Sequence, residues 1–85
     1  MATTERHGLD QRKFFDLDFW RATIRRMTAS NELKKISEEH WDEIRRDGYP
    51  KEGPNLQSWQ QNYLRLEAEE KAAREERQRI GAKYE

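Results

Sequence analysis

The residues best suited to chemistry in this chain cluster around His40. Glu39 and Glu43 stand one helical turn apart, and His40 lies between them, within reach of Glu43. Carboxylates and an imidazole are metal ligands, but the segment has no Glu-x-x-His or His-x-x-x-His pair that would complete a ligand set. We interpret the group as a solvated helix face, so we expect no metal site and no cofactor.

The rest of the chain offers no catalytic pattern. Cysteine is absent, the two histidines are 33 residues apart, and Ser58 precedes Trp59 inside an expected helix, away from any nucleophile elbow. Gly48 and Gly53 are isolated in a turn segment and do not form a phosphate-binding loop. The sequence therefore predicts that the protein is not an enzyme.

Composition predicts one small all-α domain. The chain has 85 residues, of which 33% are hydrophobic and 40% are charged, and its net charge is zero. Helix-forming residues dominate and valine is absent, a composition typical of helices. No apolar run approaches the roughly 20 residues that span a bilayer, and the N-terminus has no signal-peptide core. With no cysteine to oxidise, we expect an intracellular protein, cytoplasmic or nuclear, with no membrane contact.

Apolar spacing divides this domain into three helices. Apolar residues at helical spacing predict helices over about residues 14–29, 32–47 and 54–66. Ser30 or Asn31 would cap the second helix, Gly48 would end it in a left-handed conformation, and Pro54 would begin the third. The expected architecture is a small three-helix bundle, residues 14–66, whose third helix continues as a charged helical extension, residues 67–85. Residues 1–13 are expected to be disordered or loosely attached.

The three tryptophans suggest that the helices share one core. The expected core residues are Leu17, Trp20, Ile24, Met27, Leu33, Ile36, Trp41, Ile44, Leu56, Trp59, Tyr63 and Leu66. Burial of these side chains would barely offset the conformational entropy lost on folding. We therefore expect a partner or self-association to stabilise the chain.

The first helix carries a second apolar line, formed by Phe15, Phe19 and Ala22. This line lies roughly 120–180° from the Leu17 stripe. The charged segment after Leu66 could fold back over Phe15 and Phe19, a partner could cover them, or they could face water. Contiguous exposed apolar residues tend to mark interaction sites.

These features favour a non-catalytic protein–protein interaction module, such as an adaptor, an accessory subunit or a small inhibitor. Aromatic and arginine side chains are the usual anchors of such interfaces. The predicted partner-binding residues are Phe15, Phe19, Arg25, Arg26, Gln60 and Gln61. A dimeric structural protein, with a homo-oligomer as the functional form, is an alternative.

The chain also resembles a known family of DNA- and tail-binding domains. The sequences HWDEI at residues 40–44, GYP at 48–50 and QSWQQNYL at 57–64 resemble the Myb/SANT-like family, over about residues 16–66. The resemblance implies three helices, with Trp20 at the position of the family's first tryptophan. It also implies nucleic acid as an alternative partner.

The charges of the third helix modify this implication. In DNA-binding members that helix reads the major groove, which here would assign DNA contact to Gln57, Gln61, Asn62 and Arg65. Gln and Asn can read adenine edges, but Arg65 is the only cation in residues 55–66, and acidic residues follow at 67, 69 and 70. The protein-binding SANT branch of the family fits these charges better.

Overall fold

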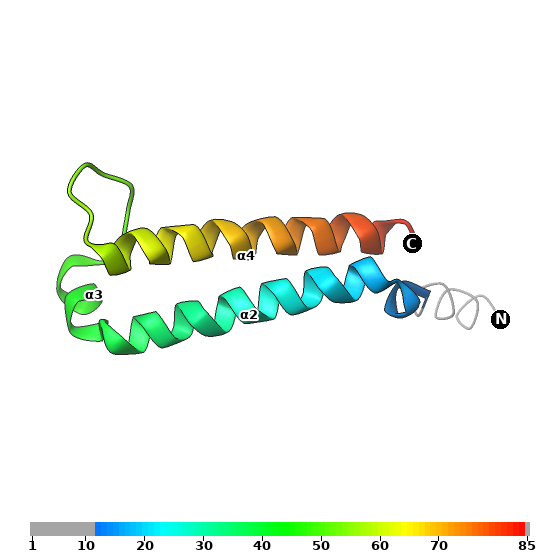
Figure 1. Ribbon diagram of the computed structural model, residues 1–85, viewed down its shortest axis with the longest axis horizontal. Coiled ribbons are helices and arrows are strands. Elements are labelled where there is room, and N and C mark those ends of the chain that lie inside the picture. Colours follow the sequence, from blue (N-terminus) through cyan, green and yellow to red (C-terminus); the bar gives the residue numbers. More distant parts are fainter. Residues whose placement is uncertain (1–11, 85) are drawn as a thin grey trace.

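The chain folds as a long helical hairpin with a short helix at its closed end (Figure 1). The structure, a computed structural model, describes residues 12–84. Within them a 3-10 turn, η1 (Lys13–Phe15), precedes α2 (Leu17–Glu39), α3 (Trp41–Asp47) and α4 (Ser58–Ala82), and there is no strand. The predicted small all-α fold is confirmed. The prediction of disorder for residues 1–13 lies outside the described residues, apart from the last two.

Helix α2 begins at a well-formed cap and runs through the predicted break. The Asp16 carboxylate accepts hydrogen bonds from the backbone N–H groups of Asp18 and Phe19, which have no partner within the helix. Ser30 and Asn31 are exposed inside the helix and cap nothing. The predicted helices over 14–29 and 32–47 are therefore wrong at that boundary. Packing against α4 along the whole length outweighs a local capping preference.

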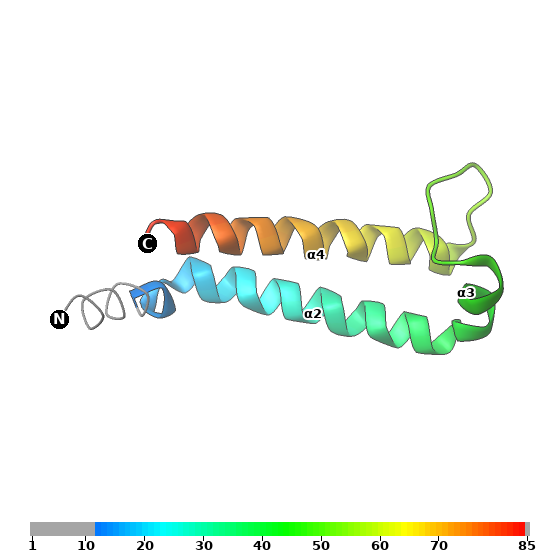
Figure 2. The same cartoon turned by 180° about the vertical axis from the view of Figure 1, so that it is seen from behind.

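The real break lies at His40, between α2 and α3. His40 has φ −117° and ψ 25°, outside helical values, and α3 then ends at Gly48. Gly48 has a positive φ of 88°, as predicted, but its ψ of 175° departs from the left-handed helical conformation of an αL cap. The loop from Gly48 to Gln57 then projects from the closed end before the chain turns into α4 (Figure 2).

Helix α4 is a single helix that includes the predicted charged extension. It begins at Ser58 and not at Pro54, and the Gln60 side chain accepts a hydrogen bond from the Gln57 backbone N–H at 2.8 Å. The helix continues through Gly81 to Ala82. Both views show α4 antiparallel to α2 over nearly the full length of α4 (Figures 1 and 2). The charged segment of α4 therefore packs on α2.

The hydrophobic core is a narrow seam between α2 and α4. At the closed end, Ile36, Tyr63 and Leu66 form a buried cluster that Leu33 and Trp59 complete. The middle is held by small residues, Ala29 and Ala73, which let the two helices approach closely. At the open end the buried residues are Phe19, Ala22 and Ile80. The core is thus built from fewer large side chains than the sequence suggests.

Of the three tryptophans, Trp59 alone packs on this core. Trp20 and Trp41 are 43% and 50% exposed, and Trp59 is partly buried at the closed end. The prediction of a common indole core is wrong because α2 places Trp20 on the side away from α4, and the seam is lined by smaller residues.

A candidate protein-binding surface on the outer side of α2

The first half of α2 exposes the apolar residues that the sequence assigns to the core. Leu17, Trp20, Ile24 and Met27 are 63%, 43%, 60% and 58% exposed. Their 3-4-3 spacing places them on one face of the helix, and the buried Phe19 and Ala22 lie on the opposite face. We call these four residues the outer stripe. The prediction that they form the core is wrong, because the second apolar line is the one that packs on α4.

An aromatic cluster fixes the start of the outer stripe. The Trp20 indole N–H donates a hydrogen bond to the Phe14 carbonyl oxygen. The Phe14 ring meets Phe19 edge-on at 5.7 Å and lies 6.0 Å from the Trp20 ring. Aromatic pairs in these geometries hold each other's orientation. Together with the hydrogen bond, these contacts orient the Trp20 ring at the surface.

A groove runs along one flank of the outer stripe. It lies between α2 and α4 and is lined by Thr23, Arg26, Met27, Ser30, Asn31 and Arg77. Arg77 donates from Nε to the Thr23 hydroxyl at 2.9 Å, and its guanidinium carbon lies 4.7 Å from the centre of the Phe19 ring. The flank is thus polar at its base and apolar at Met27, as the rim of an interface commonly is.

The structure scatters the predicted partner-binding residues. Phe15 is 88% exposed beside the start of α2, whereas Phe19 is 2% exposed and packs against the C-terminal end of α4. Phe19 therefore leaves the predicted docking surface. The fold-back of the charged segment covers Phe19 but not Phe15.

The two predicted arginines serve the hairpin itself. Arg25 donates to Glu69 at 2.8 Å and to Glu76 at 3.1 Å, and the second hydrogen-bonded pair is Arg26 with Glu70 at 3.3 Å. The hydrogen bond and charge of Glu69, followed by Glu76, raise the pKa of Arg25 above its ordinary value. These ion pairs link α2 to α4, so neither arginine is a free anchor.

The predicted glutamines lie near the start of α4, at the end of the hairpin opposite Phe15. Gln60 is engaged in the first turn of α4, and the Gln61 amide donates to the Leu56 carbonyl oxygen at 3.2 Å. The predicted set therefore forms no single surface. One feature of the sequence does indicate the outer stripe. The first helix carries two apolar lines, and only one of them can face α4.

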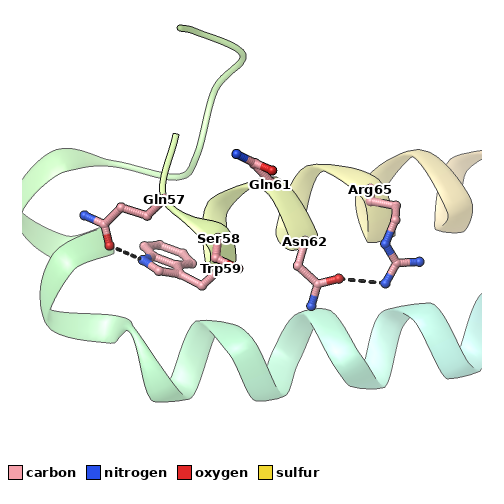
Figure 3. A pocket seen from close by; sticks show the side chains of 6 residues that line it. All are labelled: Gln57, Ser58, Trp59, Gln61, Asn62 and Arg65. Carbon is pink, nitrogen blue, oxygen red and sulfur yellow. Dashed lines mark hydrogen bonds between the residues drawn. The ribbon is translucent and has the colours of Figure 1, made fainter. Parts of the chain in front are cut away.

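The residues assigned to DNA contact do lie together. Gln57, Gln61, Asn62 and Arg65 line one hollow at the start of α4, together with Ser58 and Trp59 (Figure 3). All four polar heads are already engaged: Arg65 donates to Asn62 at 2.6 Å, the Gln57 side chain accepts from the Trp59 indole at 3.0 Å, and Gln61 donates to the Leu56 carbonyl oxygen. Arg65 is the only cation that lines the hollow.

The His40 group packs at the closed end. The His40 ring stacks on Trp59 with ring centres 4.2 Å apart and planes 3° from parallel. The Trp59 indole N–H also donates to Glu43 at 3.1 Å, and His40 Nδ1 lies 4.0 Å from the same carboxylate. Within residues 12–84, His, Cys, Asp and Glu side chains nowhere gather in the groups of three or more that could hold a metal ion. This arrangement joins α3 and α4 at the turn.

Known proteins supply no template for this surface. No family model, no curated protein and no solved structure matches the chain. Among the described helices, none combines the length and the apolar character needed to cross a membrane.

Proposed function

We propose that the chain is a non-catalytic protein-interaction module that docks a protein partner through the outer stripe of α2. It would act as an adaptor, an accessory subunit or a small inhibitor. The observation that carries this proposal is the exposure of Leu17, Trp20, Ile24 and Met27 on the side of α2 that faces away from α4.

The size of the patch supports this role. Large apolar side chains present about 150–250 Å² each when fully accessible, and the outer stripe shows roughly half of that from each residue. Phe14, which packs on Trp20, extends the patch at 43% exposure. The whole patch is on the order of several hundred Å², the range that marks interaction sites on small proteins.

The helix that carries the patch also favours binding. Residues at positions i, i+3, i+7 and i+10 are the anchors by which an apolar helix face meets another helix or a groove. Because α2 is already folded against α4, binding would not have to order the helix, which lowers its entropic cost. Trp20, a residue type enriched among interface hot spots, lies inside the patch.

A matched pair of variants tests the proposal. Ile24→Asp places a charge in the centre of the outer stripe, and Ala68→Asp places the same side chain on the exposed side of α4. We expect proteins from a source lysate to be retained by the wild-type chain and by Ala68→Asp but lost with Ile24→Asp. Equal helical content by circular dichroism would show that the variants are folded. Identical retention by all three chains would contradict the proposal.

A second candidate function, duplex DNA binding, is favoured by one observation. The hollow at the start of α4 gathers Gln57, Gln61, Asn62 and Arg65. Phosphate contacts make such binding steeply dependent on salt. This function predicts a mobility shift on mixed-sequence duplex at low salt that Arg65→Ala removes. The absence of a shift for the wild-type chain at low salt would eliminate it.

A further inference from the structure

We infer that the occupant of the outer stripe is a second copy of this chain. In this dimer α2 of one protomer lies antiparallel on α2 of the other, and the two hairpins form a layer of four helices with each α4 on the outside. The inference rests on the proposed function, because it names the partner of the same surface. Four observations on the stripe and its surroundings carry it.

The first observation is the symmetry of the spacing. The stripe reads 3-4-3 in either direction along α2, so an antiparallel copy presents the same pattern in reverse. With a two-fold axis halfway along the stripe, Leu17 meets the partner's Met27 and Trp20 meets the partner's Ile24. The large Trp20 ring then faces the smaller Ile24 side chain. A self-complementary patch of this kind is what an isologous dimer requires.

The second observation is the groove beside Met27. Phe14 packs on Phe19 and Trp20, which places it on the same flank of the stripe as this groove. A two-fold axis perpendicular to the plane of the two α2 helices brings like flanks together. The Phe14 of each protomer then reaches the groove of the other, near the partner's Ser30. The groove and the exposed ring supply the two halves of one contact.

The third observation is the area. The outer stripe with Phe14 offers on the order of 500 Å² per chain, more than half of the ~800 Å² that each partner buries in a specific interface of standard size. The core of the hairpin needs such support, since three of its nine buried apolar residues are alanines. Small chains with thin cores are commonly stabilised by oligomerisation.

The fourth observation is that the patch is confined to one side. The opposite surface of the hairpin, the outer side of α4, is polar; its exposed residues include Gln61, Arg65, Lys71, Glu75, Gln78 and Arg79. A chain with a single self-complementary face forms a closed pair and does not extend into a filament. The net charge of zero leaves no overall repulsion between two copies.

The oligomeric state of the purified full chain tests the inference. Sedimentation or light scattering from low micromolar to submillimolar concentration should give twice the mass of one chain for the wild type and for Ala68→Asp. Ile24→Asp should raise the dimer dissociation constant by about a hundredfold or more, since a carboxylate enters the apolar interface twice. A wild-type chain that stays monomeric throughout, or an Ile24→Asp dimer of unchanged affinity, would overturn the inference.

Disulfide trapping tests the antiparallel direction. The chain has no cysteine, so introduced thiols are the only ones present. An oxidised mixture of Leu17→Cys and Met27→Cys chains should give the mixed cross-link. Either variant alone should give no cross-link. Its two identical cysteine positions in the dimer lie ~15 Å apart along the helix axis, beyond the reach of a disulfide. Efficient cross-linking of Met27→Cys with itself, without the mixed product, would overturn the antiparallel arrangement.

The two proposals fail in different ways. If the pure chain is monomeric while Ile24→Asp still abolishes retention of other proteins, the dimer is wrong and the docking function stands. If neither self-association nor retention depends on Ile24, both are wrong. Binding of the pure chain to anionic lipid vesicles that Ile24→Asp abolishes, without self-association, would assign the stripe to a membrane surface and overturn both.

Discussion

The hydroxyl of Tyr84 donates a hydrogen bond to the carboxylate of Asp16 at 2.6 Å. Asp16 is the N-cap of α2, and Tyr84 follows the last turn of α4, so this bond ties the two open ends of the hairpin together. The bond from Tyr84, with smaller contributions from the Phe19 and Asp18 backbone N–H groups, lowers the pKa of Asp16 below its ordinary value of 3.8. The same bond raises the pKa of Tyr84 above 10.0.

Tyr84→Phe should therefore lower stability within a defined pH window. A lowered Asp16 pKa contributes stability that is present above 3.8 and is lost as the pH falls below it. A raised Tyr84 pKa contributes stability that is present below 10.0 and is lost as the pH rises above it. In urea unfolding, the free energy of unfolding of the wild type should exceed that of Tyr84→Phe most near neutral pH. The difference should shrink toward low and high pH.

Tyr49→Phe is the matched control for this measurement. Tyr49 is 54% exposed and lies near the other end of the hairpin, where its ring meets Tyr63. Its variant should shift the unfolding midpoint little near neutral pH. A Tyr84→Phe chain that tracks the wild type across the whole pH range would show that the bond to Asp16 does not hold the open end.

Phe19 and Phe15 should differ sharply when each is replaced by alanine. Phe19 is 2% exposed and contacts Phe14, Trp20 and Arg77, so Phe19→Ala should lower the free energy of unfolding by about 3–5 kcal/mol. Phe15 is 88% exposed, and Phe15→Ala should change it by less than about 0.5 kcal/mol. Urea unfolding in an Ile24→Asp background, where self-association does not contribute, gives both values. Equal losses of stability would mean that the two rings are equally buried, which would contradict the structure.

The sequence predicts the helical class well because composition and turn residues act locally. Gly48 ends α3 where expected, and Tyr63 and Leu66 are buried as the 3-4-3 pattern predicts. The join between α2 and α3 is misplaced because Ser30 and Asn31 carry the same local signal whether they cap a helix or face solvent inside one. Only packing against α4, some forty residues later in the chain, decides between the two.

The candidate surface is harder to predict for a related reason. α2 carries two apolar lines, and size alone favours Leu17, Trp20 and their neighbours as the core. The seam prefers the line with Ala22 and Ala29, because small residues let α4 approach closely enough for Arg25 to reach Glu69 and Glu76. The hydrophobicity of one helix does not contain this information; it depends on what the facing helix presents.

The ion pair between Arg26 and Glu70 should contribute little to stability. The two side chains are 41% and 19% exposed, and their N–O distance is 3.3 Å. A double-mutant cycle with Arg26→Ala and Glu70→Ala should give a coupling free energy below about 1 kcal/mol, and high salt should reduce it.

Ala73→Leu, at a fully buried position between the helices, should cost about 1–3 kcal/mol through overpacking and should not respond to salt. If the coupling free energy of the ion pair exceeded the free energy lost in Ala73→Leu, charge pairing and not close packing would hold the middle of the hairpin.

Two glycines should respond in opposite directions when replaced by alanine. Gly81 lies inside α4, and an added Cβ there would lie 3.7 Å from Phe19 and 3.8 Å from Lys13, which are ordinary contact distances. Gly81→Ala should therefore raise the free energy of unfolding by about 0.5–1 kcal/mol, through the better helix propensity of alanine. Gly48 has φ 88° and ψ 175°, a region that side chains with a Cβ avoid, so Gly48→Ala should lower the free energy of unfolding by about 1–3 kcal/mol. Thermal unfolding of the two variants at equal concentration measures both effects. If Gly81→Ala were also destabilising, the last turn of α4 would have to pack more tightly on Phe19 than these distances allow.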